Sequence, residues 1–308
     1  MFSLILRISF IAILMRSIFG CITLLLCMHS LSACEVCGCG SGGGDMGLVP
    51  LYQVHMVSAD AQAWQFSYPG YETRDRFFQL DFRGRLYLHP RWLLSGQLPY
   101  RIHQRMDADG LQQRSGVGDA QLLLHRVLWR TMPEDSARWQ HLLQVGLGAK
   151  APTGAYSPPS ELGLPAHFNL GTGAWDALGQ LLYQTRVDQW GLAAQAAFRW
   201  RGTHGSGYRF GDVLNGQVQL FRVLQRGRTR LTPRVGMAAE QLGRDVQGQF
   251  FQEGTGGVGA FGLMGIDLYW RKRLSISLQG QLPLVQNYAE GAIRSQPRLA
   301  AQIQFFIM

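Results

Sequence analysis

The sequence predicts an all-β protein: an antiparallel transmembrane β-barrel of about 12 strands, preceded by a cleaved signal peptide. Apolar and polar residues alternate with a period of two along segments of about 9–12 residues, the length of a tilted strand that crosses a membrane. Apolar residues make up 46% of the chain, yet its mean hydropathy is −0.03, as expected when the two kinds alternate. Most tryptophans lie near segment ends, as in an interfacial girdle.

The first predicted element is a signal peptide over residues 1–33. It contains no acidic residue and carries Arg7 and Arg16, with apolar runs on both sides of Arg16. Residues 15–33 alone have the basic start, short apolar centre and small final residue of a signal, so Met15 is a candidate start of translation. An uncleaved membrane anchor is the weaker alternative. Cleavage before Cys34 would lower the formal net charge from +9 to +7.

A cysteine- and glycine-rich segment over residues 34–60 follows. Leu31-Ser-Ala-Cys34 is similar to the lipobox of bacterial lipoproteins, which makes Cys34 a lipidation candidate. Cys34, Cys37 and Cys39 could instead converge on one Cu or Zn ion, with His55 as a further ligand. A disulfide is the third possibility, because exported cysteines usually pair. Covalent haem attachment is excluded because glycine, not histidine, follows Cys37. The lipid and metal hypotheses compete for Cys34.

The barrel is expected over residues 61–308. Its twelve predicted crossings are 62–70, 76–89, 91–104, 117–130, 138–150, 173–186, 189–201, 210–224, 228–242, 257–270, 273–285 and 297–308. Short links alternate with longer ones, which are 105–116, 151–172, 202–209, 243–256 and 286–296. We expect the short links to be periplasmic turns and the long ones external loops.

Closure into a barrel has a physical reason. An open sheet edge in hydrocarbon would leave backbone groups unpaired at several kcal/mol each. A soluble sandwich, in which apolar faces meet inside, is the alternative, and strand length and the aromatic girdle argue against it. The partners expected are therefore outer-membrane lipid and a small-molecule solute, at the bacterial outer membrane. No run of basic residues suggests nucleic acid, and the oligomeric state stays open.

The polar face of each strand is expected to line the lumen. Charged residues predicted there are Arg83, Arg85, Arg199, Arg222, Arg230, Arg234, Asp81, Glu240 and Asp267, joined by Asp119 and Asp176. The first interpretation is that these charges pair across strands, because unpaired charge in a narrow lumen is costly. The alternative is an arginine-biased lumen that favours anions.

Glycines recur in ordered motifs: Gly116-x-Gly-Asp119, Gly148-x-Lys150-x-Pro-Thr-Gly154 and Gly171-Thr-Gly173-x-x-Asp176, after Leu98-Pro99-Tyr100. No predicted helix follows them, so they indicate turns at a barrel rim and not a nucleotide site. Together they resemble the family named for the meta-pathway of phenol degradation, which consists of transporter-like outer-membrane barrels. A subset begins its mature chain with Cys-x-x-Cys-Gly-Cys-Gly, as residues 34–40 do here. The resemblance implies a channel or transporter and carries over no catalytic residue.

An enzymatic function is not expected. Some outer-membrane barrels hydrolyse lipids with serine and histidine, and His204-Gly-Ser206 lies in a predicted external loop. No strand-turn-helix arrangement around a nucleophile is present. The expected function is a channel or transporter for a small molecule, with a link to metal handling left open. The alternatives are a non-transporting barrel that presents the cysteine segment for metal binding or sensing, and a structural barrel with a plugged lumen.

Overall fold

The computed structural model describes residues 54–131, 138–271 and 273–307. One antiparallel sheet contains the strands β1 (His55–Ser67), β2 (Arg74–His89), β3 (Trp92–Asp107), β4 (Gly110–Val117), β5 (Gln121–Arg130), β6 (Trp139–Lys150), β7 (Asp176–Val187), β8 (Trp190–Trp200), β10 (Val213–Arg222), β11 (Leu224–Arg226), β12 (Thr229–Leu242), β15 (Gly257–Trp270), β16 (Leu274–Tyr288), β17 (Arg294–Ser295) and β18 (Arg298–Ile307). Consecutive crossings pair in order, and β1 pairs with β18 from His55↔Ile307 to Ala63↔Leu299. The sheet is therefore a closed barrel.

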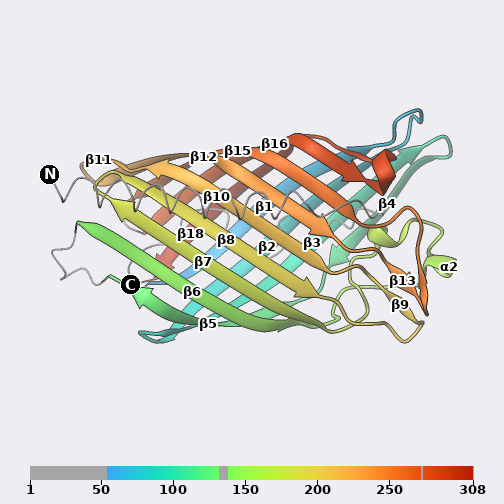
Figure 1. The fold of residues 1–308 in the computed structure, drawn as a ribbon, viewed down its shortest axis with the longest axis horizontal. Coiled ribbons are helices and arrows are strands. Elements are labelled where there is room, and N and C mark those ends of the chain that lie inside the picture. Colours follow the sequence, from blue (N-terminus) through green and yellow to red (C-terminus); the bar gives the residue numbers. More distant parts are fainter. Residues whose placement is uncertain (1–53, 132–137, 272, 308) are drawn as a thin grey trace, which may run out of the picture. The chain divides into compact units, whose positions relative to one another are not determined.

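The barrel has twelve crossings when β4 and β5 are counted as one and β17 is set aside as a rim strand, with β11 extending β10. This confirms the predicted twelve-stranded antiparallel barrel. In Figure 1 the short links and the end of β18 lie at one end, called here the inner end. The long connections lie at the opposite, outer end. Short turns of such barrels face the periplasm and long loops face outward, which gives the two ends their sides of the outer membrane.

The outer connections carry the remaining elements. The segment between β6 and β7 holds the short helix α2 (Pro159–Leu162) and the 3-10 turn η1 (Ala166–Phe168), and η2 (Ala289–Gly291) follows β16. A separate small sheet joins β9 (Tyr208–Arg209), β13 (Val246–Gln247) and β14 (Phe250–Phe251). No helix in the described residues is long and apolar enough to span a membrane.

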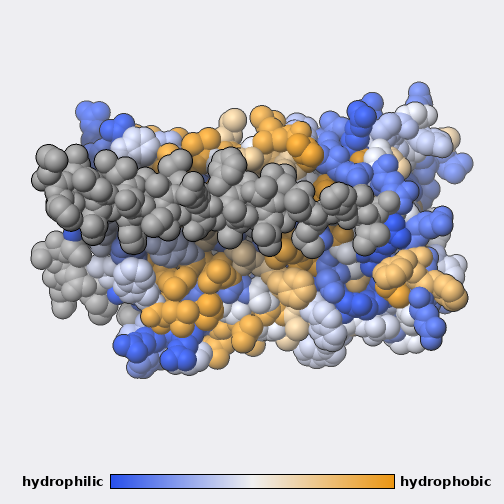
Figure 2. All heavy atoms as spheres, viewed as in Figure 1, coloured by the Kyte–Doolittle hydropathy of each residue, from blue (hydrophilic) through white to orange (hydrophobic). Residues whose placement is uncertain are grey.

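The side chains alternate as the sequence predicts. In β5, Leu122 and Leu124 are 55% and 41% exposed, whereas Leu123 between them is 9% exposed. Figure 2 shows an apolar band around the middle of the visible face, with hydrophilic residues toward both ends. The interior is polar: Asp60, Asp81, Thr232 and Asp267 are all fully buried. An apolar exterior around a polar interior excludes the soluble sandwich, because that fold buries its apolar faces. The protein is an outer-membrane barrel.

Two strand boundaries differ from the prediction. β1 begins at His55, before the expected barrel start at residue 61, and ends at Ser67. Its outward face begins with His55 and Val57 and continues with Ala59 and Ala61, so the alternation of large apolar and polar residues is weak there. Residues 105–116, expected to be a loop, form a hairpin in which β3 and β4 pair from Tyr100↔Val117 to Asp107↔Gly110. Its outward face mixes the polar Gln104 and Gln113 with the apolar Met106 and Leu111, so the alternation of a membrane-embedded strand is weak here.

The aromatic girdle also needed correction. Trp92, Trp129, Trp139, Trp190, Trp200 and Trp270 are exposed on the outer face as expected. Trp64 and Tyr269 instead point into the barrel and are 6% and 5% exposed. Trp64 lies between the outward residues Ala63 and Gln65, and Tyr269 lies between the outward residues Leu268 and Trp270. Proximity to a strand end is therefore not enough to assign an aromatic residue to the girdle. The predicted signal peptide and the cysteine segment up to residue 53 lie outside the described residues.

Candidate functional site in the barrel lumen

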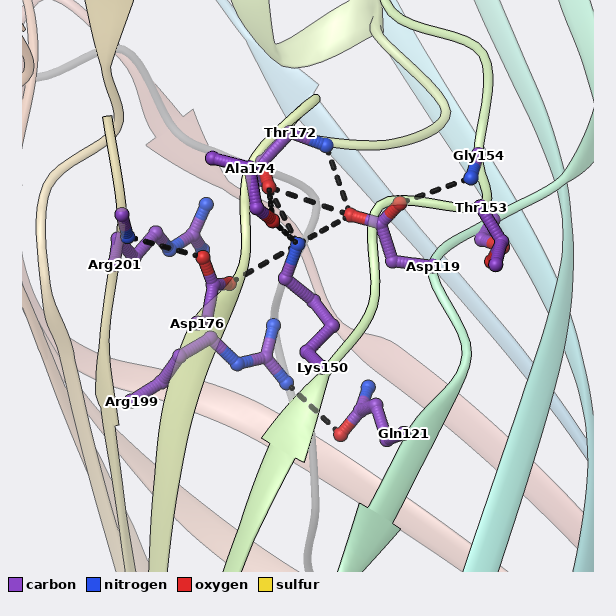
Figure 3. Close-up of polar contacts among 12 residues, drawn as sticks. Asp119, Gln121, Lys150, Thr153, Gly154, Thr172, Ala174, Asp176, Arg199 and Arg201 are labelled. Carbon is purple, nitrogen blue, oxygen red and sulfur yellow. Dashed lines mark hydrogen bonds and ion pairs between the residues drawn. The ribbon is translucent and has the colours of Figure 1, made fainter. Parts of the chain in front are cut away.

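A buried lysine at the outer end of β6 belongs to one glycine motif and contacts residues of the other two. Lys150 Nζ lies 2.5 Å from Asp119 Oδ2 and 3.2 Å from Asp176 Oδ2, and all three side chains are at most 2% exposed. It also donates to Thr172 Oγ1 and to the Ala174 carbonyl oxygen. Figure 3 shows these groups converging from three separate segments. The cluster therefore joins β5, β6 and the segment before β7.

Asp119 holds two of the loop segments through backbone groups. Its carboxylate accepts hydrogen bonds from Gly154 N at 2.9 Å and Thr172 N at 2.8 Å. A Cβ atom on Gly171 would lie 2.3 Å from Asp119 Oδ1. Glycine is required at this position because the two segments approach so closely. The motifs thus form one buried structural joint.

The joint directs the segment between β6 and β7 into the outer end of the lumen. His103 Nδ1 lies 3.2 Å from the Phe168 carbonyl oxygen, and Arg101 Nη1 donates to the Leu170 carbonyl oxygen at 2.9 Å. Both His103 and Arg101 are inward-facing residues of β3. Phe168 is fully buried, and Leu170 is 4% exposed. This connection, residues 151–175, is named the inward loop below.

A second ionic cluster fixes the inward loop to β2. Asp75 Oδ2 lies 2.8 Å from Arg105 Nη2 and 3.2 Å from His167 Nε2, and it accepts a hydrogen bond from Tyr68. The outward residues on either side of Asp75 are exposed arginines, which places this carboxyl beyond the apolar belt. Burial alone would raise its pKa, but hydrogen bonds from Arg105 and His167 outweigh burial and hold the pKa of Asp75 low, at about 2.

Aromatic side chains fill the outer end beneath the inward loop. Trp64 stacks on Phe77 with ring centroids 5.7 Å apart, and Phe168 packs against Phe77 at 5.5 Å. The same buried cluster contains Val213, Leu242, Phe261 and Tyr288, which come from β10, β12, β15 and β16. Side chains from these strands, from β1 and β2 and from the inward loop therefore form an apolar layer across the lumen.

A cavity lies at mid-barrel, below this layer. Its polar lining is dominated by amides: Gln62, Gln180, Gln195, Asn215, Gln217, Gln279 and Gln281. Trp64, Phe261 and the small side chains of Ala197, Ala238 and Ala300 give it an apolar part. The two charged residues that line it, Arg298 and Glu240, pair with each other at 2.7 Å. The cavity thus offers hydrogen bonds without an unpaired charge.

Ion pairs fill the lumen on the inner side of the cavity. Arg83 lies 2.9 Å from Asp60 and 3.3 Å from Asp81. Arg234 lies 3.0 Å from Asp267 and donates to the amide oxygens of Gln219 and Gln279. Asp60, Asp81 and Asp267 are fully buried, so these charges hold one another in place across strands. We call this the ion-paired layer.

Comparisons with known proteins agree with this architecture. Residues 75–295 match the family model described as "Putative MetA-pathway of phenol degradation". The chain belongs to this family. The family resemblance predicted from the motifs is therefore confirmed, and the match covers more than two thirds of the chain. No curated protein matches the chain.

Solved structures of other proteins resemble this protein in fold. An outer-membrane channel from Pseudomonas putida F1 matches at a TM-score of 0.61 and 17% identity, covering 86% of this chain and 98% of that one. The β domain of a Bordetella autotransporter matches at 0.49 and 11% identity, over 83% and 100% of the two chains. The first likeness supports the barrel fold.

Most of the charged residues that the sequence predicts for the lumen lie inside the barrel. Arg83, Arg234, Asp81, Asp267 and Glu240 lie in the ion pairs described above. Arg85 donates to the Gln144 amide at 3.3 Å, and Arg199 donates to Gln121 at 3.4 Å. Arg230 lies over the Tyr269 ring at 3.7 Å. In these placements each of the charged side chains is held by a neighbouring residue.

Arg222 is the exception, and the expectation that it lines the lumen is wrong. It is exposed and shares the outward face of β10 with Leu214 and Leu220, while Phe221 beside it points inward. Its guanidinium lies 5.3 Å from the Trp190 ring and donates to Gln189. The apolar belt has ended at this height, so an outward arginine can reach the polar interface.

Residues for metal chemistry are not brought together in the part of the chain that is described. No three histidine, cysteine or acidic side chains there could hold a metal ion. His55 accepts a hydrogen bond from Tyr87 N through Nδ1 at 3.2 Å. Cys34, Cys37 and Cys39 lie outside the described residues, so the lipid, disulfide and metal hypotheses stay predictions.

Several site residues were missed at the sequence level. The glycine motifs place Lys150 at the barrel rim and assign it no ion pair, although it is one of two lysines after residue 33 and a lone lysine among arginines is a usable signal. Asp60 was assigned to the segment before the barrel. The glutamines of the cavity were recognised only as members of polar faces, because nothing in their spacing shows that they meet.

Proposed function

We propose that the protein is an outer-membrane channel for small, uncharged molecules. The observation that carries the proposal is the amide-lined cavity at mid-barrel, between the inward loop on one side and the ion-paired layer on the other. A solute that crosses the barrel has to pass this level. The similar Pseudomonas putida structure is an outer-membrane channel, which supports the same function.

The chemistry of the lining favours uncharged solutes. Amide side chains both donate and accept hydrogen bonds, so they can replace the water around a neutral polar group. Arg298 and Glu240 already neutralise each other, and the Arg298 guanidinium also lies 4.1 Å from the Phe261 ring. A charged solute would lose its hydration without gaining a free counter-charge, which is costly. Trp64 and Phe261 add apolar contacts for a ring or alkyl group.

Transport through this path requires both the apolar layer beneath the inward loop and the ion-paired layer to move. On this proposal the protein is not an enzyme. We expect liposomes that contain the folded protein to swell in isotonic solutions of small neutral solutes. Swelling should be much slower for carboxylates or ammonium compounds of similar size. Liposomes with heat-unfolded protein are the control. Equal rates for folded and unfolded protein would refute the channel, and equal rates for neutral and charged solutes would refute its selectivity.

The metal hypothesis for Cys34, Cys37 and Cys39 is independent of this proposal. Elemental analysis of reduced wild-type protein and of a Cys37→Ser/Cys39→Ser variant would test it. Loss of Cu or Zn from the variant is the outcome expected from that hypothesis, and equal metal in both proteins would refute it.

A further inference from the structure

A shallow groove lies on the outer wall of the barrel near its outer end. It is lined by Ala63, Trp64, Gln65, Arg76, Phe77, Phe78, Ile102, Gln104, Pro297 and Leu299. Most of these residues belong to the outward-facing positions of β1, β2 and β3, so the groove faces the membrane and not the lumen. It lies on the other side of the barrel wall from the cavity proposed for solutes, and Ala63, Trp64 and Leu299 line both.

The groove arises where the neighbouring strand is interrupted. β17 ends at Ser295 and β18 begins at Arg298. Between them Gln296 N donates to the Gln65 carbonyl oxygen, and the Gln296 amide donates to Ser67 Oγ. Pro297 has no N–H to continue the ladder. Ala63, which pairs with Leu299 just beyond this gap, presents only a methyl group on the outward face.

Cationic side chains stand at the outer edge of the groove. Arg76 lines it and is paired in register with Gln65, while Ser67, two residues further along β1, is flanked by Arg74 on one side and Arg294 on the other. All three arginines are exposed, and none has an ion pair or hydrogen bond within the described part of the chain. No residue that lines the groove is acidic.

The height of these arginines matches the outer membrane–water interface. On β2 the outward residues change from Phe82 and Phe78, which are 53% and 39% exposed, to Arg76 and Arg74. The apolar part of the groove therefore lies in the hydrocarbon of the outer leaflet, and the arginines lie at head-group level. Arginine binds phosphate through two parallel hydrogen bonds, which suits an anionic head group.

We propose that this groove binds a phosphorylated, acylated glycolipid of the outer leaflet. An acyl chain occupies the strip formed by Ala63, Phe78 and Leu299, and a phosphate contacts Arg76 with Arg74 and Arg294 beside it. Charge complementarity and continuity with the apolar belt both favour such a lipid. The inference does not depend on what passes through the lumen.

The test uses full-length protein in detergent and native mass spectrometry. The probe is a bis-phosphorylated, hexa-acylated glucosamine disaccharide. An Arg74→Gln/Arg76→Gln variant should bind it more weakly, by about 5-fold for each arginine removed. The matched control is Arg226→Gln/Arg228→Gln, which removes two exposed arginines at the inner end and should leave the affinity unchanged. Equal affinities of wild type and the Arg74/Arg76 variant would overturn the proposal.

A second pair of variants tests the acyl-chain contact. Ala63→Trp should fill the groove and weaken binding, whereas Ala59→Trp, outward on the same strand but outside the groove, should not. Retained heat-modifiable migration shows that each variant is folded. The phosphate-free form of the lipid should bind weakly, and inorganic phosphate alone should not compete. Equal binding of the phosphate-free lipid, or full competition by inorganic phosphate, would contradict the proposal.

Discussion

Lys150 Nζ on β6 and the Asp119 carboxylate beside β5 lie 2.5 Å apart in a buried ion pair, although 31 residues separate them in the chain. Asp176 adds a second carboxylate at 3.2 Å. Because all three side chains are buried, the lysine compensates charges that water cannot reach. The pair anchors both ends of the inward loop, and several consequences can be measured.

Replacing Lys150 should destabilise the buried cluster around Asp119. Lys150→Met leaves Asp119 and Asp176 buried without their cation, which should lower the free energy of unfolding by about 3–5 kcal/mol. Urea unfolding followed by heat-modifiable migration measures the change. Arg138→Met is the matched control: it breaks the exposed Arg138–Asp188 pair, whose side chains are 74% and 60% exposed, and should have little effect. Similar stabilities of the two variants would contradict the structural role of Lys150.

The glycine motif predicts a steric effect at Gly171. A Gly171→Ala substitution places Cβ 2.3 Å from Asp119 Oδ1, so the loop or the carboxylate has to move. We expect a loss of about 1–3 kcal/mol in unfolding free energy. The same substitution at Gly179 in β7, where no atom lies within 4 Å of the added Cβ, should be tolerated. Equal stabilities of Gly171→Ala and Gly179→Ala would contradict the close approach of Gly171 to Asp119.

The pKa of Asp75 predicts how the second cluster depends on pH. In the folded protein the pKa is about 2, below the ordinary value of about 3.9, so the charged carboxylate stabilises the fold. This contribution should be complete above pH 4 or so and should be lost as the pH falls toward 2. The difference in melting temperature between wild type and Asp75→Asn should therefore be constant from pH 7 to 5 and shrink in stronger acid. A difference in melting temperature that grows in acid would contradict the lowered pKa of Asp75.

Phe168 should control access to the cavity from outside. It is fully buried beneath the inward loop, and Phe168→Ala would open the apolar layer that it completes. We expect severalfold faster uptake of neutral solutes by proteoliposomes, with some loss of stability. Phe250→Ala is the control, because that side chain is 77% exposed in β14. Uptake that stays at the wild-type rate in Phe168→Ala would show that this layer does not limit entry.

The barrel could be predicted from the sequence because alternation is a local property. Each crossing shows its two faces within about ten residues, and the even strand count follows from closure. The β3–β4 hairpin was missed because alternation disappears once a strand leaves the hydrocarbon. Arg222 was misplaced for a related reason: polarity indicates the lumen only within the apolar belt.

The site depends on contacts that no local pattern contains. The inward loop has irregular backbone, so its path is set by His103, Arg101 and Lys150, which lie on other strands. The motif glycines were correctly interpreted as sites of close backbone approach, but their meeting point around Asp119 required the three-dimensional structure. The cavity amides likewise come from five different strands, and only closure of the barrel brings them together.

The central claim is that solutes pass through the amide-lined cavity, and two alanines of one strand test it most directly. Ala197 on β8 lines the cavity beside Asn215, whereas Ala194 faces outward and lies outside the cavity lining. The measurement is the rate at which proteoliposomes take up a small neutral solute. Ala197→Trp should reduce this rate severalfold by filling the cavity, and Ala194→Trp should match wild type. Equal uptake by the two variants would contradict the proposed path.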